Sequence, residues 1–190
     1  MVLLAALLLA VVPCMARAQE AAKASTVNDE ALRLFDDAAN KLVRLAEAIP
    51  AEKYTWRPGE GVRSVSEVFL HVAAGNYSIP RRLGTPPPEG FNPQGYDKST
   101  TDKAKVIEAL KQSTEHVRKA YAGVTDVEKT APWFGGRQAT MREMMFFIAI
   151  HGHEHLGQII AYARMNGITP PWTEEAQQRQ QQQPPAKRPQ

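Results

Sequence analysis

Two histidines with a spacing of four residues, His151 and His155, lie in a stretch whose apolar residues recur with the period of an α-helix. That spacing predicts that both imidazoles project close to the centre of the apolar side of the helix. Buried imidazoles are costly unless their nitrogens are satisfied, and one shared metal ion would satisfy both rings. The alternative is a pair of core histidines hydrogen-bonded to carbonyl groups, and the pair alone does not decide between the two.

A third histidine, His71, lies near the edge of the apolar side of another predicted helix, where an inward-leaning ring can reach a neighbouring helix. Taken alone, such a residue is more often structural. Three inward imidazoles from two helices, however, leave one or two coordination positions for water or substrate, as catalytic sites do. We therefore predict a divalent transition-metal cofactor, Zn or Ni first, with Fe, Mn and Cu as alternatives that imidazole also suits.

The polar residues around this set are less decisive. Gln158 is predicted to project close to the His151 side and Glu154 to its flank, so that either can hold an imidazole N–H or a bound water. An interhelical or surface role is at least as good an interpretation of both. The order His-Glu-His differs from the H-E-x-x-H pattern of metalloproteases, so no residue is assigned as a catalytic base. His153 and His116 are predicted to face solvent.

Four stretches of helical periodicity position these residues, at residues 27–49, 64–79, 101–122 and 140–166. Two of them open on capping boxes, Ser64 to Glu67 and Thr140 to Glu143. No stretch of any length has the alternation of a β-strand, so we predict an all-α four-helix bundle. The Pro- and Gly-rich connection at 83–99 can cover a site and permits an order other than up-down. The shorter connections predict antiparallel neighbours.

The two ends of the chain differ in composition from the bundle. Residues 2–12 form an apolar run, followed by Pro13 and the small-x-small pattern Ala16-Arg17-Ala18, which predicts a signal peptide at 1–18 and a periplasmic or secreted protein. The only cysteine, Cys14, would leave with that segment. Residues 19–26 are then a flexible linker, 27–172 the bundle, and 173–190 a disordered Gln/Pro-rich tail. No stable membrane insertion is expected after cleavage.

Composition narrows the class of partner. The apolar fraction is 43% and the charged fraction 23%, as in an ordinary globular domain. The net charge is only +3, and Lys and Arg are scattered, so we expect no nucleic-acid partner. A small-molecule substrate of unknown identity is expected, and a homodimer is left open.

The sequence resembles the DinB-like (YfiT-like) superfamily of metal-binding four-helix bundles. The resemblance covers residues 28–172 and depends on Trp56-Arg57-Pro58, on residues 62–67, and most specifically on residues 151–158, which run into 162–171. It implies His71, His151 and His155 as metal ligands. Members of the family resemble thiol S-transferases, isomerases or metal-dependent hydrolases.

The functional hypothesis is therefore an exported metal-dependent hydrolase or thiol transferase. An export signal makes a cytosolic thiol cosubstrate less natural. The alternative hypothesis is a non-catalytic metal- or ligand-binding protein of the cell envelope.

Overall fold

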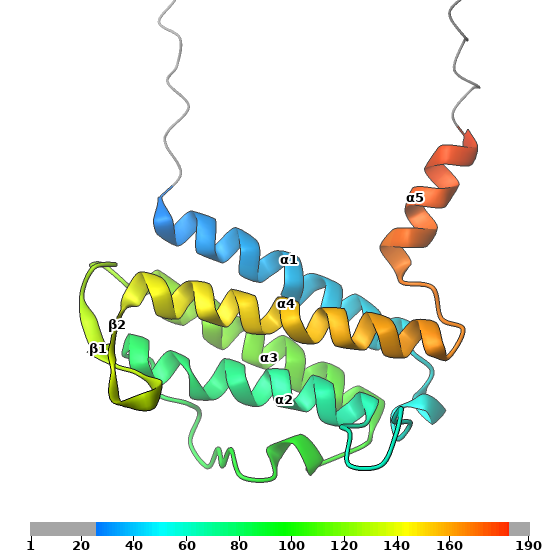
Figure 1. The fold of residues 1–190 in the computed structure, drawn as a ribbon, viewed down its shortest axis with the longest axis horizontal. Coiled ribbons are helices and arrows are strands. Elements are labelled where there is room, and N and C mark those ends of the chain that lie inside the picture. Colours follow the sequence, from blue (N-terminus) through cyan, green and yellow to red (C-terminus); the bar gives the residue numbers. More distant parts are fainter. Residues whose placement is uncertain (1–25, 183–190) are drawn as a thin grey trace, which may run out of the picture.

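The computed structural model describes residues 26–182, and the predicted signal peptide therefore lies outside the described residues. Four long helices form the body of the molecule, as predicted (Figure 1). They are α1 (Val27–Ala48), α2 (Val65–Ser78), α3 (Lys103–Ala122) and α4 (Met141–Met165). None of the helices in the described part is long and apolar enough to cross a membrane.

Capping residues set where the helices begin. The Thr26 hydroxyl and the Asp29 carboxylate form a reciprocal capping box at α1, and Ser64 and Glu67 form the predicted one at α2. At α4 only half of the predicted box is present. Thr140 accepts from the backbone N–H of Glu143, but the carboxylate of Glu143 turns outward to Arg137.

The helices follow an order that the connection lengths did not reveal. Both α1 and α2 pack against α3 and α4, so that α1 and α2 lie diagonally opposite each other. In Figure 1, α1 and α4 run in one direction and α2 and α3 in the other. The prediction that shorter connections join antiparallel neighbours is therefore wrong for α1–α2 and for α3–α4, because the helices of each pair are antiparallel but lie across the bundle from each other. Each of these two connections is long enough to cross an end of the bundle.

Aromatic side chains hold the long connection between α2 and α3 against the bundle. Phe91 and Tyr96 pack on the buried ring of Tyr77, with ring centroids 5.1 and 6.3 Å from it. The connection contains two 3₁₀ turns, Pro80–Leu83 and Tyr96–Lys98. The second of these turns lies against α2.

A small antiparallel hairpin joins α3 to α4. Its strands, β1 (Thr130–Pro132) and β2 (Gln138–Thr140), have three residues each and flank the 3₁₀ turn Phe134–Gly136. Strands this short carry too few residues to show alternation, which is why the sequence did not predict them.

The C-terminal segment departs from the prediction of disorder. Helix α5 (Pro171–Gln182) continues well beyond Trp172, whereas residues 183–190 lie outside the described part. Proline suits the first turn of a helix, and glutamine is a good helix former, so a low-complexity run can still be helical. An ion pair between Arg44 and Glu175 connects α5 to α1.

The core fills the space between the four long helices. Tyr54, in the connection after α1, is fully buried, and its hydroxyl donates a hydrogen bond to the carbonyl of Ala46. At the opposite end, the buried Tyr121 hydroxyl donates to the carbonyl of Met145 on α4. The first bond joins the connection to α1, and the second joins α3 to α4.

Candidate metal centre

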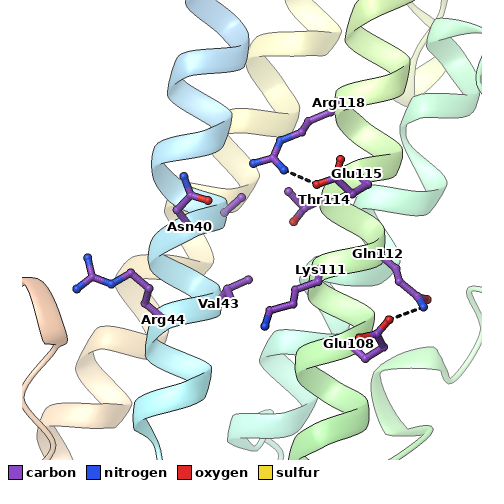
Figure 2. Close-up of a pocket in the computed structure, with 10 residues that line it drawn as sticks. Asn40, Val43, Arg44, Glu108, Lys111, Gln112, Thr114, Glu115 and Arg118 are labelled. Atoms are coloured by element: carbon purple, nitrogen blue, oxygen red, sulfur yellow. Dashed lines mark hydrogen bonds and ion pairs between the residues drawn. The ribbon is translucent and has the colours of Figure 1, made fainter.

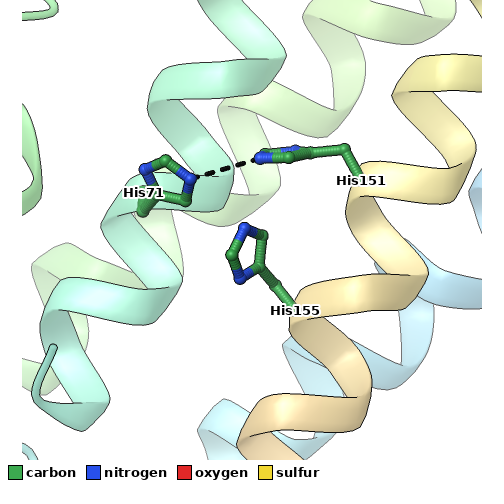
Figure 3. A group of neighbouring side chains, drawn as sticks. All are labelled: His71, His151 and His155. Atoms are coloured by element: carbon green, nitrogen blue, oxygen red, sulfur yellow. Dashed lines mark hydrogen bonds between the residues drawn. The ribbon is translucent and has the colours of Figure 1, made fainter. Parts of the chain in front are cut away.

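The three histidines singled out from the sequence meet between α2 and α4 (Figure 3). Nε2 of His71 lies 3.3 Å from Nε2 of His151, and the ring of His155 is 4.6 Å from each of the other two between centroids. One candidate ligand atom from each residue lies within 4.8 Å of the other two. The expected convergence of rings from two helices is therefore present.

The three rings differ in exposure. His155 is 9% exposed and lies deepest, whereas His71 and His151 are half-buried. The set is thus embedded on the inner side and accessible from the α2–α4 surface. A metal ion held by such a set would keep coordination positions toward solvent, as catalytic sites do and closed structural sites do not.

Gln158 fixes the protonation pattern of His155. Its side-chain oxygen lies 2.8 Å from Nδ1 of His155, and its amide nitrogen donates to the hydroxyl of Tyr162 at 3.0 Å. Nδ1 therefore carries the proton, and Nε2 is left with a lone pair for a metal ion. Tyr162 is itself held by an edge contact with Trp56, whose ring centroid is 5.4 Å away.

His151 occupies a space that depends on a glycine. A Cβ atom at Gly75, one turn beyond His71 on α2, would lie 2.6 Å from Cε1 of the His151 ring. Nδ1 of His151 is buried and has no hydrogen-bond partner within the described residues. A buried nitrogen without a partner is unfavourable, so the position of this ring favours a role beyond packing.

The electrostatic environment keeps two of the rings neutral. Burial, followed by the charges of Arg63 and His155, lowers the pKa of His71 to about 4. Burial, followed by the charges of His155 and His71, lowers the pKa of His151 to about 3. Neutral imidazole is the form that binds metals, so both side chains are ready as ligands at neutral pH.

These features fit a divalent transition ion. The donors are three uncharged nitrogens from a rigid pair of helices, the usual ligand type for Zn, Ni, Cu and Fe. No carboxylate within the described residues completes this set.

An open cavity of about 530 Å³ lies beside Gln158, the residue that contacts His155, and none of the three histidines lines it. The rest of the wall comes from the connection before α2, from the first turn of α2, and from Asp97 and Lys98 of the long connection. The loop that was expected to cover a site therefore contributes to this cavity.

A larger groove of about 780 Å³ lies on another side of the bundle, between α1 and α3 (Figure 2). Most of its charged residues are paired, among them Arg118 with Glu115 and Asp36, and Lys111 with Glu47. No histidine lines it. The groove is therefore a less suitable place for metal chemistry than the α2–α4 side.

Comparison with known proteins places this arrangement in a family. The family model of the DinB superfamily matches residues 34–159, which include all three histidines. The chain belongs to the DinB superfamily. No curated protein matches it at a significant level.

Solved structures share the DinB fold at low sequence identity. YfiT from Bacillus subtilis, described as a probable metal-dependent hydrolase with an unusual four-helix bundle topology, is 16% identical with a TM-score of 0.60, and the match covers 75% of this chain and 89% of YfiT. An uncharacterised protein from Escherichia coli UTI89 is 18% identical, with a TM-score of 0.58 and coverages of 75% and 95%. The DinB-like protein YjoA from B. subtilis is 22% identical, with a TM-score of 0.55 and coverages of 74% and 93%.

The polar residues near the three histidines of this DinB protein differ in their contacts. Gln158 contacts His155, whereas Glu154 is exposed and influences His71 only through its charge. His153 faces outward as predicted, and its Nε2–H donates to the carbonyl of Leu34. The prediction that His116 is exposed is wrong.

His116 is half-buried on α3, where its ring packs on Tyr77 at 5.4 Å between centroids. The long connection covers this part of α3, and a helical periodicity cannot show such a cover. Sequence reasoning also missed the role of Gly75 in the DinB site. Only its distance of four residues from His71 could have suggested it.

Proposed function

We propose that this protein is a metal-dependent enzyme, a hydrolase in the first instance, that holds one divalent transition ion through His71, His151 and His155. The observation that carries the proposal is the approach of three imidazoles from α2 and α4 to within 4.8 Å of one another at their candidate ligand atoms.

Hydrolysis is favoured over other reactions by the character of the site and by one relative. When bound, a divalent ion supplies Lewis acidity toward an oxygen of the substrate. The chain's own contribution is to keep two rings neutral by burial, to orient His155 through Gln158, and to leave one side of the set accessible. YfiT, which shares the fold, is described as a probable metal-dependent hydrolase.

Elemental analysis of the purified protein tests the metal site. Wild type is expected to retain about one equivalent of a transition metal, and His71→Ala to lose most of it because one of three ligands is gone. His153→Ala is the matched control, since this residue lies on the same helix but faces outward. Equal metal content in wild type and His71→Ala would contradict the proposal.

A second measurement separates an enzyme from a binding module. With Co²⁺ in the site, the visible spectrum is expected to change when acetohydroxamate is added, because an open coordination position accepts a new oxygen ligand. A change with a small thiol and none with hydroxamate would favour thiol transfer instead. A spectrum that responds to neither would indicate a closed, non-catalytic ion.

Export remains a separate proposal that depends on residues 1–18, outside the described part of the chain. We propose that the apolar run and the Ala16-Arg17-Ala18 pattern direct the protein to the periplasm or the medium. N-terminal sequencing of the protein from fractionated cells is expected to begin at Gln19. An uncleaved chain in the cytosolic fraction would contradict this.

A further inference from the structure

The cavity beside Gln158 contains more positive than negative charge. Its wall includes the cations Arg57, Arg63 and Lys98 and the carboxylates Glu67 and Asp97. All five belong to the connection before α2, to the first turn of α2 or to the long connection. The wall is therefore built where two irregular segments meet beside Gln158.

The two arginines differ in how much of their hydrogen-bonding capacity is used. Nη1 of Arg57 donates to the carbonyl of Val62, and Nη2 to Glu67, so both terminal nitrogens have protein partners. Arg63 makes one contact, from Nε to Asp97 at 3.3 Å. Within residues 26–182, its two terminal nitrogens have no protein acceptor.

The two carboxylates, by contrast, are already engaged. Glu67 accepts from the backbone N–H of Ser64 at 2.7 Å and from Arg57 at 3.3 Å. Asp97 receives the Nε contact from Arg63. The exposed Lys98 has no ion-pair partner among residues 26–182. The fork of Arg63 and the ammonium group of Lys98 are thus the groups free to bind an incoming anion.

From this arrangement we propose that the cavity binds an anionic group of the substrate, a carboxylate or a phosphate, through Arg63 and Lys98. A guanidinium fork matches the two oxygens of such a group. Gln158 connects the cavity to the triad, because it forms part of the wall and its side-chain oxygen accepts a hydrogen bond from Nδ1–H of His155. This substrate class rests on the proposed function, whereas anion binding itself does not require the metal.

An NMR titration of the metal-free protein tests the anion site by itself. Acetate and inorganic phosphate are the probes, and uncharged acetamide is the control ligand of the same size as acetate. We expect the anions, but not acetamide, to shift the signals of the Gln158 side chain and of the backbone at 97–98. The anion that binds more tightly then indicates whether the cavity prefers a carboxylate or a phosphate.

Arg63→Gln is expected to weaken anion binding about tenfold, because a charge-assisted contact is lost. Arg44→Gln removes the same charge and also a single ion pair, but on α1, and is expected to bind anions like wild type. Lys98→Gln is a second test variant. Because Lys98 has no ion pair among the described residues, its result does not depend on the Arg63–Asp97 contact. Unchanged anion affinity in Arg63→Gln or in Lys98→Gln would overturn the proposal.

Metal analysis of the same variants separates this proposal from the first. Arg63→Gln is expected to retain metal like wild type at neutral pH, because Arg63 is not a ligand and burial, the largest cause of the lowered pKa of His71, is unchanged. A wild type that binds acetate through Arg63 but retains no metal would contradict the proposed enzyme and leave the anion site standing. A wild type that retains metal but binds neither anion would contradict the anion site and leave the proposed enzyme standing.

Discussion

Gly75 and His151 are in such close contact that no side chain fits between them: a Cβ atom at position 75 would lie 2.6 Å from Cε1 and 3.1 Å from Nδ1 of the imidazole. The ring of one candidate ligand therefore rests directly on the backbone of the helix that supplies another. Rotation of the ring would relieve a larger residue at position 75, but it would also move Nε2 away from His71.

Gly75→Ala is expected to weaken metal binding at least about tenfold while the fold remains stable, because alanine is the better helix former and only the ring has to move. Chelator competition measures the affinity, and urea unfolding measures the stability. Gly157→Ala on α4 is the matched control, since a Cβ atom at position 157 would meet nothing within 4 Å. Equal metal affinity in the two variants would show that the space above Gly75 is unimportant.

Gln158→Leu is expected to lower metal affinity by about tenfold or more, because the Nδ1 proton of His155 loses its acceptor and the ring loses its orientation. Gln158→Glu retains an acceptor and is expected to retain most of the affinity. Gln112→Leu serves as the control, since Gln112 bonds only to the exposed Glu108 on α3. Identical affinities for the leucine and glutamate variants at position 158 would argue against a role for this hydrogen bond.

Stability of the metal-free protein is expected to fall as the pH decreases. An ordinary histidine titrates at 6.5, whereas the folded protein holds the pKa of His71 at about 4 and that of His151 at about 3. Between these values the unfolded chain binds more protons, so the free energy of unfolding decreases as the pH falls from 6.5 toward 3. Urea midpoints at a series of pH values measure the effect.

The double variant His71→Gln/His151→Gln isolates this contribution from that of the carboxylates, which titrate in part of the same range. Its stability is expected to depend less on pH between 6.5 and 4 than that of wild type. Parallel curves for the two proteins would mean that these rings do not resist protonation.

Added metal is expected to stabilise the folded protein. At a free metal concentration about 100 times the dissociation constant, the gain is about 2.7 kcal/mol, which corresponds to about 5–10 °C in Tm for a domain of this size. Thermal unfolding with and without EDTA measures it. His153→Ala is expected to show the full increase and His71→Ala little of it; an equal increase in both would point to binding elsewhere.

Much of the fold and of the candidate site could be predicted because both follow helical periodicity. Apolar spacing located the four long helices, and the i, i+4 spacing placed His151 and His155 on one side of α4. The contact from Gln158 to His155 follows from the same geometry.

The parts that were missed depend on contacts between distant segments. Whether α1 lies beside α2 or across from it is decided by packing, not by periodicity along either helix. His116 is covered by a connection whose path the sequence does not encode locally. Gly75 matters only because α4 brings His151 to it. In α5, the low-complexity composition concealed a helix-forming preference.

The side-by-side packing of α1 and α4 has a consequence for folding. The apolar face of the first long helix is covered largely by the last one of the bundle, more than ninety positions later in the chain. Contacts so distant in sequence slow the folding reaction. Until α4 has docked, much of the apolar face of α1 is exposed to water, and this is the stage at which the chain is most prone to aggregate.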